Sequence, residues 1–427
     1  MRHHRIPIRR TRALLVVIAL VVAACGGSDD STAGEPVAES STTSSTTSTT
    51  TTTAAPTTTA APTTTVPPGP SAADLEAAVR ADLQSATGVT ALVDRMAELQ
   101  VPGLAVAIVV DGEIVTSFAV GSTPAGEPMR TDTAIQVASV SKPVAALAAL
   151  ALAADGVVDL DDDVEGLLTS YDLPAGAQST DAPVTISGLL AHSAGTNVDG
   201  FLGYGDPADA PTRAELLAGE GNTAAVEVVQ PPGTTFLYSG GGYELMAQTL
   251  ADVTGESFED LVVRAVLEPA GMVDSFYAVG LDDEQAANAT EGSIGGNGLG
   301  NRWQSHPESA AAGLWTTADD LGALLASFSR ALAGDAGLLP TEWARLAVTP
   351  NTPAAGIGAS AQGFFVDDPT SPTRWFHNGR NLGYTAEIAG SIDGGHAVAV
   401  VTNAFPGGTD LAREIIATVE RTLEEGS

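Results

Sequence analysis

The only lysine of the chain, Lys142, follows Ser139 by three residues. Residues with this spacing share one face of a helix, so the hydroxyl and the amine can meet. A serine becomes a strong nucleophile when a nearby base takes its proton, and an amine can do this where burial favours its neutral form. Arginine, which fills all 17 other basic positions, stays protonated. The pair therefore predicts nucleophilic catalysis. The alternative is a surface lysine beside a helix-cap serine.

The segment after Ser139 has the signals of a helix. Pro143 falls in the expected first turn, where its missing N–H costs nothing, and a body rich in alanine and leucine follows. Gly156 is placed to end the helix. We therefore expect Ser139 and Lys142 at the start of a buried helix.

Two hairpins are expected near opposite ends of the folded region. The first joins residues 103–110 and 113–120 through an Asp-Gly turn, and the second joins 384–391 and 396–402. A helix over about 410–423 closes the chain, and the middle is mostly helical and rich in loops. This order predicts an α+β fold with an antiparallel sheet flanked by helices and an inserted, mostly helical lobe.

Several motifs together resemble the penicillin-recognising serine hydrolases. Ser139-Val-Ser-Lys142 is similar to their S-x-x-K. Other similar segments follow in the family's order: Thr185–Gly195 (L-L-x-H-T-S-G), Pro232–Tyr243 (P-G-x-x-F-x-Y-S-N-x-G-Y), Leu267–Met272 (P-L-G-M), Ala312–Leu321 (G-G-L-x-S-T-x-x-D-L) and His377–Gly379 (K-T-G or H-x-G). Over roughly residues 90–425 they resemble the superfamily of class C β-lactamases, D-alanyl-D-alanine carboxypeptidases and esterases.

The resemblance implies a role for each matching residue. Ser139 would be the acylated nucleophile, Lys142 its proton acceptor, and Tyr238 the second member of the proton relay. The backbone N–H groups of Ser139 and Arg380 would form the oxyanion hole. His192, in contrast, is expected to be a buried structural histidine.

The H-x-G segment would form the side of the cleft that faces the substrate, with His377 and Gly379 on a strand at the sheet edge. His377 stands where many relatives have lysine, so the cation that binds a substrate carboxylate is lost or depends on pH. Arg380 is a possible substitute for that cation.

Gly240 stands where the family has an asparagine that holds the substrate amide. A glycine at this position can also widen the cleft. The glycine-rich stretch 293–302 either lines the cleft or is a surface excursion, and we favour the excursion. Both departures, at Gly240 and at His377, favour an ester over a β-lactam.

The predicted function is an acyl-enzyme serine hydrolase that acts on a small-molecule or peptide ester or amide, like an esterase or a D-Ala peptidase. A class C-like β-lactamase is one alternative. A catalytically silent protein of the same fold, which binds cell-wall peptide or a partner, is another. No metal or cofactor is expected, because the few histidines show no ligand pattern.

The N-terminal region predicts export and anchoring. Residues 1–24 have a basic start and a short apolar run typical of a signal peptide, and Cys25, the only cysteine, stands where a lipobox places the lipidated residue. Residues 25–71 are rich in Ser, Thr, Pro and Ala and predict a disordered tether, which leaves 72–427 as the hydrolase domain. We expect a lipoprotein on the outer face of the cytoplasmic membrane.

The charge balance limits the partners. The chain has 52 acidic and 18 basic residues, a net charge of −34. Nucleic acids and anionic membrane surfaces need a basic face, which such a chain lacks. Contact with a membrane is therefore expected only through the lipid anchor. The oligomeric state does not follow from the sequence.

Overall fold

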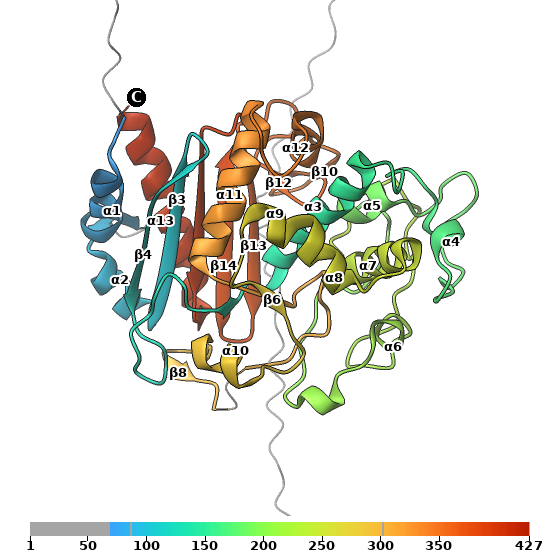
Figure 1. The fold of residues 1–427 in the computed structure, drawn as a ribbon, viewed down its shortest axis with the longest axis horizontal. Helices are drawn as coiled ribbons and strands as arrows, with labels where there is room; N and C mark the ends of the chain where they lie inside the picture. Colours follow the sequence, from blue (N-terminus) through green and yellow to red (C-terminus); the bar gives the residue numbers. More distant parts are fainter. Residues whose placement is uncertain (1–68, 86–87, 301–302, 427) are drawn as a thin grey trace, which may run out of the picture. The chain divides into compact units, whose positions relative to one another are not determined.

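The computed structural model describes residues 69–85, 88–300 and 303–426 (Figure 1). The predicted signal peptide, the lipidation site at Cys25 and all but the end of the predicted tether lie outside these residues. None of the helices in the described part of the chain has both the length and the apolar character needed to cross a bilayer.

An eight-stranded antiparallel sheet organises the fold, in the order β10-β11-β12-β13-β14-β15-β3-β4. Its strands are β3 (Gly103–Val110), β4 (Glu113–Gly121), β10 (Thr352–Ala354), β11 (Gly358–Ser360), β12 (Phe365–Val366), β13 (Arg374–Asn381), β14 (Tyr384–Ser391) and β15 (His396–Thr402). The two predicted hairpins are present, and β15 pairs with β3 to join them in one sheet. The α+β prediction is confirmed.

The two faces of the sheet carry side chains of different size. On β3, Leu104, Val106 and Ile108 point into the core under α13 (Gly407–Glu425). The alternate residues, such as Ala105 and Ala107, point to the opposite face, where α11 (Ala318–Ala333) packs. Small residues on that face let α11 approach the sheet closely (Figure 1).

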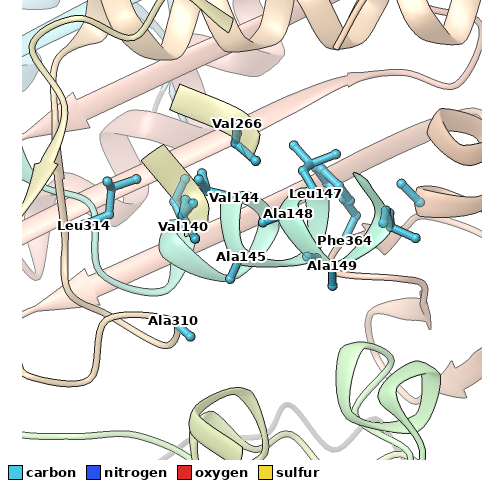
Figure 2. Packing of buried hydrophobic residues seen from close by; sticks show 14 of the residues in the cluster. Val140, Val144, Ala145, Leu147, Ala148, Ala149, Val266, Ala310, Leu314 and Phe364 are labelled. Atoms are coloured by element: carbon cyan, nitrogen blue, oxygen red, sulfur yellow. The ribbon is translucent and has the colours of Figure 1, made fainter. Parts of the chain in front are cut away.

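Helix α3 (Ser141–Ala154) lies in the core on the α11 side of the sheet. It is apolar on nearly all sides, because other elements surround it (Figure 2). Val266, Leu314 and Phe364 belong to the same cluster of buried side chains. The helix that carries Lys142 is therefore held rigidly by packing.

The chain between β4 and β13 holds most of the helices, joined by long loops, and contains the predicted inserted lobe. The remaining elements are α1 (Ala72–Ala81), β1 (Leu83–Ser85), β2 (Gly88–Thr90), α2 (Leu92–Glu98), β5 (Ile135–Gln136), η1 (Ala138–Val140), α4 (Val164–Leu167), α5 (Ile186–Leu190), η2 (Pro207–Asp209), α6 (Arg213–Leu217), α7 (Gly240–Thr254), α8 (Phe258–Val262), η3 (Val263–Leu267), α9 (Glu268–Ala270), β6 (Phe276–Tyr277), α10 (Asp283–Asn288), β7 (Ser293–Ile294), β8 (Asn297–Gly298), β9 (Leu314–Thr316), α12 (Thr341–Ala347) and β16 (Ala404–Phe405). In the glycine-rich stretch, β7 and β8 form a short hairpin beside β16.

Candidate active site

Ser139 lies in the short turn η1, directly before α3. The preceding Ala138 has φ +50°, a left-handed conformation that is rare for a residue with a side chain. The Ser141 hydroxyl stabilises the turn: it donates to the Ala138 carbonyl (2.6 Å) and accepts from the Leu314 N–H (3.1 Å). The strained turn presents a half-buried Ser139 at the N-terminal end of α3.

Lys142 is buried, with 1% of its surface exposed, and its amine has two hydrogen-bond partners. Nζ lies 3.1 Å from Ser139 Oγ and 2.8 Å from the Ala311 carbonyl oxygen. The nitrogen also lies over the rings of Tyr238 (5.1 Å to the centroid) and Tyr243 (5.7 Å). The arrangement therefore brings together the predicted nucleophile, the predicted base and a carbonyl that orients the amine.

Tyr238 is held by the neighbouring His192. The centroids of the two rings lie 4.3 Å apart, and His192 Nδ1 accepts the Ser239 N–H at 3.0 Å. Burial, aided by the charge of Lys142 and by His377, lowers the pKa of His192 well below its ordinary 6.5. The imidazole is therefore neutral and can serve as this acceptor, in keeping with the structural role expected for it.

His377 is buried against Phe365, with ring centroids 5.2 Å apart. Nδ1 lies 2.9 Å from the Asn378 carbonyl oxygen, while Nε2 is buried without a hydrogen-bond partner. Burial, followed by the charge of Lys142, lowers the pKa of His377 to about 3. The side chain is therefore neutral at physiological pH, unlike the lysine of a K-T-G segment.

Gly379 lies directly against the backbone of Val137 and Ser139. A Cβ atom on Gly379 would lie 2.1 Å from the Val137 carbonyl oxygen and 2.8 Å from the Ser139 nitrogen. No side chain fits at these distances, so only glycine lets β13 approach the turn. The strand end and the Ser139 N–H meet where the predicted oxyanion hole lies.

The Arg380 side chain occupies the other face of β13. In the register with β14, Arg380 pairs with Thr385, and Gly379 pairs with Ala386 of the core on the α3 side. Successive side chains of a strand alternate between faces, so Arg380 points toward the α13 side. Glu387, on that side, influences the guanidinium more strongly than Tyr238 does. The side chain of Arg380 therefore lies away from the side of the strand where the lysine of a K-T-G segment would stand, which speaks against the substitution considered above, although its backbone N–H remains beside Gly379.

Gly240 is covered by the loop that contains Val198, Asp199 and Phe201. The Gly240 N–H donates to the Asp199 carbonyl (3.3 Å) and the Gly241 N–H to that of Val198 (2.9 Å). A Cβ on Gly240 would lie 2.9 Å from Phe201 Cε2. The Phe201 ring therefore lies against Gly240, on the side where a side chain would project.

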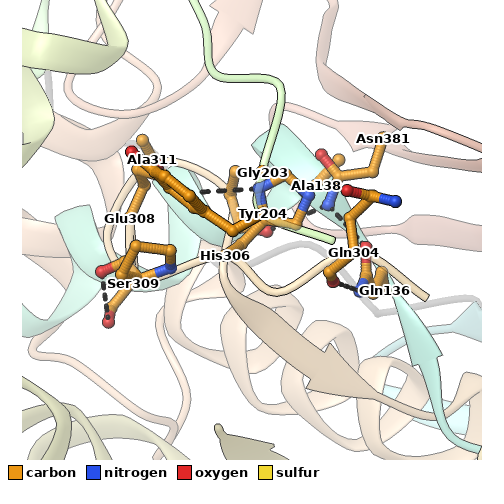
Figure 3. A network of polar contacts seen from close by, with 12 residues as sticks. Gln136, Ala138, Gly203, Tyr204, Gln304, His306, Glu308, Ser309, Ala311 and Asn381 are labelled. Carbon is orange, nitrogen blue, oxygen red and sulfur yellow. Dashed lines mark hydrogen bonds and ion pairs between the residues drawn. The ribbon is translucent and has the colours of Figure 1, made fainter. Parts of the chain in front are cut away.

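A polar network joins the segments beside the turn that holds Ser139 (Figure 3). Asn381 Nδ2, at the end of β13, donates to Gln136 Oε1 at 2.9 Å, and Gln136 Nε2 donates to the Gln304 carbonyl at 2.7 Å. The network ties β13 to β5, which leads into the Ser139 turn. Among residues 69–85, 88–300 and 303–426, no three His, Cys, Asp or Glu side chains come together as metal ligands.

The model of the Beta-lactamase family matches residues 89–422. The chain belongs to this family. Esterase EstB of Burkholderia gladioli is 29% identical over 293 residues, which are 61% of this chain and 72% of the esterase. Penicillin-binding protein 4 of Amycolatopsis lactamdurans is 29% identical over 180 residues, but these are only 42% of this chain and 45% of that protein. The resemblance seen in the motifs is confirmed.

A solved structure shows the same family fold. The octameric penicillin-binding protein homologue from Pyrococcus abyssi superposes with a TM-score of 0.63 and 24% sequence identity, over 78% of this chain and 77% of that chain. At this level of identity the likeness shows the fold alone, and it confirms the predicted sheet with its inserted helical lobe.

Three parts of the site in this Beta-lactamase family member were not predicted from its sequence. The Ala311 carbonyl gave no signal, because any residue has one. Phe201 was hidden in a loop without a motif. Glu244 has a signal in the sequence, because a carboxylate within the apolar run after Gly240 indicates a buried ion pair. In the structure, Glu244 is linked to Lys142 by two hydrogen bonds, both made by the backbone of Ala311.

The pKa of His377 leads to a prediction about stability. The folded protein keeps the imidazole neutral down to about pH 3, whereas the unfolded chain binds a proton below about 6.5. The unfolding free energy should therefore fall as the pH drops from 6.5 toward 3. His377→Gln should lose less stability than the wild type between pH 7 and pH 5 in urea titrations. An equal loss in both proteins would contradict the buried neutral imidazole.

Proposed function

We propose that the protein is a serine hydrolase that acts on neutral carboxylic esters through an acyl-enzyme at Ser139. The observation that carries the proposal is the 3.1 Å contact between Lys142 Nζ and Ser139 Oγ, with the amine also bound to the Ala311 carbonyl. A buried amine that donates to a carbonyl can aim its lone pair at the serine hydroxyl.

In the proposed reaction, Lys142 Nζ takes the Ser139 proton while Oγ attacks the ester carbonyl carbon. The resulting oxyanion accepts hydrogen bonds from the N–H groups of Ser139 and Arg380, where Gly379 lets the two segments converge. The C–O bond breaks, and the alcohol leaves with the proton. Water then attacks the acyl-enzyme and gives its proton to Lys142, assisted by Tyr238 as the resemblance implies. Lys142 returns this proton to Ser139 Oγ as the acid leaves.

The surroundings of the pair favour a neutral substrate. His377 is uncharged at the position where a cation would bind a substrate carboxylate. The Arg380 side chain lies on the other face of the sheet. A β-lactam or a peptide with a free C-terminus would bring a carboxylate without a matching cation there, which is costly. The relative named an esterase, Esterase EstB, supports the same choice.

A side-by-side assay tests the proposal. A short-chain nitrophenyl ester, a chromogenic cephalosporin and a D-Ala-D-Ala peptide are offered to the wild type and to Ser139→Ala. We expect kcat/KM for the ester to exceed that for the cephalosporin by about 100-fold or more, since an uncompensated charge costs several kcal/mol. Ser139→Ala should lose both turnover and labelling by a fluorophosphonate probe.

Other results of the assay point elsewhere. Faster turnover of the cephalosporin or the peptide would make the protein a β-lactamase or a peptidase. No turnover and no labelling of the folded wild type would favour a silent binding protein. Labelling that survives Ser139→Ala would exclude Ser139 as the nucleophile.

We also propose, from the sequence alone, that the protein works outside the cytoplasmic membrane. The short apolar run before Cys25 and the tether that follows support a lipid-anchored domain. Metabolic labelling with a fatty-acid analogue should mark the wild type and not Cys25→Ser.

A further inference from the structure

The carbonyl that orients Lys142 is itself held by a buried carboxylate. Ala311 accepts from Lys142 Nζ through its oxygen (2.8 Å) and donates through its N–H to Glu244 Oε1 (2.9 Å). Glu244 lies on α7, and none of its surface is exposed. One residue of a loop therefore joins the lysine to a carboxylate that the proposed reaction does not use.

A guanidinium holds the other oxygen of this carboxylate. Arg213 Nε donates to Glu244 Oε2 at 3.0 Å, and another Arg213 nitrogen lies 2.6 Å from Glu259 Oε1. Glu259 in turn accepts from the Ser309 hydroxyl. The loop is thus fixed at Ser309 and at Ala311 by two carboxylates that Arg213 bridges (Figure 3 shows the loop).

The end of this hydrogen-bond chain at Arg213 and Glu259 lies beside a surface pocket. Arg213, Glu259, His306 and Ser309 line a pocket of about 280 Å³. Glu244 lies behind Arg213, between this pocket and Lys142. The order of contacts from the pocket inward is therefore Arg213, Glu244, Ala311 and Lys142.

We propose that Glu244 is a positioning residue that holds the Ala311 carbonyl in place and so orients the Lys142 amine toward Ser139. The inference rests on the proposed function, because it gives Lys142 the role of base. The same contacts make Glu244 the nearest buried carboxyl group along the chain of hydrogen bonds to the amine. Its removal therefore changes the alignment of Lys142.

The charged and titratable groups around Glu244 come from several elements: Arg213 of α6, Glu259 of α8, Tyr277 of β6, Glu308 of the loop and Lys142 of α3. Burial raises the pKa of Glu244 to about 7, while Arg213 and the Ala311 N–H oppose that rise. A glutamine at this position keeps the volume of the side chain. Its NH₂ group, however, would face either the Ala311 N–H or the Arg213 Nε–H, and because both are donors, one of the two hydrogen bonds would be lost.

The test compares Glu244→Gln with the wild type in the rate of fluorophosphonate labelling of Ser139 across pH. We expect the maximal rate to fall about 10-fold or more, because the base is no longer aligned. We also expect the wild-type rate to change near pH 7, where Glu244 titrates, and Glu244→Gln to lack this step. A purely structural role would leave the shape of the profile unchanged.

The matched control is Glu414→Gln. Glu414 forms a similar largely buried pair with Arg95, at 2.7 and 2.9 Å, but on α13. This variant should lose a comparable amount of thermal stability and keep the wild-type rate and profile.

Each outcome decides the proposal. Equal rates and profiles in the wild type and Glu244→Gln would overturn it and leave the proposed function standing. No labelling of the wild type would overturn both the inference and the proposed function.

If Glu244→Gln does not fold, Arg213→Lys takes its place, since it keeps the positive charge and loses the guanidinium group that bridges Glu244 and Glu259. A several-fold slower labelling rate in Arg213→Lys supports the proposal, and the wild-type rate overturns it.

Discussion

Lys142→Arg should lower kcat/KM for a nitrophenyl ester by about 10³-fold or more, while the protein stays folded. The substitution keeps the positive charge and removes the capacity to accept a proton from Ser139. The arginine must also fit a site in which only 1% of the lysine is exposed, and where Nζ already touches Ser139 Oγ and the Ala311 carbonyl. Steady-state kinetics and fluorophosphonate labelling measure the loss, and circular dichroism with thermal unfolding checks the fold.

The control is the opposite substitution, arginine to lysine, at an exposed position. Arg130 is about half exposed and pairs with Asp132. Arg130→Lys gives the chain a second lysine and should change neither activity nor stability beyond about 0.5 kcal/mol. Full activity in Lys142→Arg would show that the chain's single lysine is not the base.

The distribution of basic residues supports this role for Lys142. Several arginines form exposed ion pairs, such as Arg80 with Glu76 and Arg264 with Glu256, where a permanent charge is suitable. Within the described residues, Lys142 has no carboxylate within 4.0 Å and instead contacts a hydroxyl, a carbonyl and two aromatic rings. Lys142 therefore differs from these arginines in its surroundings, because it lies against the hydroxyl that it would deprotonate and not against a carboxylate.

The sequence predicted best what depends on near neighbours in the chain. The Ser139–Lys142 contact follows from a spacing of three residues. The hairpins follow from two runs of strand-forming residues on either side of a tight turn. The antiparallel sheet flanked by helices then followed from the two hairpins and from the resemblance, whereas the order of its strands was not predicted. Such features need no knowledge of distant contacts.

What the sequence missed depends on contacts between distant segments. Ala311 lies 169 residues beyond Lys142, and a backbone carbonyl leaves no mark on the sequence. The Phe201 ring over Gly240 comes from a loop whose path no motif indicates. The face on which Arg380 lies depends on the register between β13 and β14, and a shift of one residue would reverse it.

Gly379→Ala should lower kcat for ester hydrolysis by about 10²- to 10³-fold, the loss expected when an oxyanion-hole donor is misplaced. The added Cβ would lie 2.1 Å from the Val137 carbonyl oxygen and 2.8 Å from the Ser139 nitrogen. Both are backbone atoms, so either β13 or the turn must move, and the two N–H groups separate. We expect KM to change less than kcat, because the lost contacts form mainly in the transition state.

Gly390→Ala separates this effect from general strain. Gly390 lies toward the other end of the same strand pair, and its added Cβ would lie 2.5 Å from Trp375 Cζ2 and 2.7 Å from the His396 carbonyl oxygen. Both variants should lose about 1–3 kcal/mol of unfolding free energy in urea titrations. Only Gly379→Ala should lose kcat when rates are divided by the folded fraction. A wild-type kcat in Gly379→Ala would mean that the approach of β13 to Ser139 does not form the oxyanion hole.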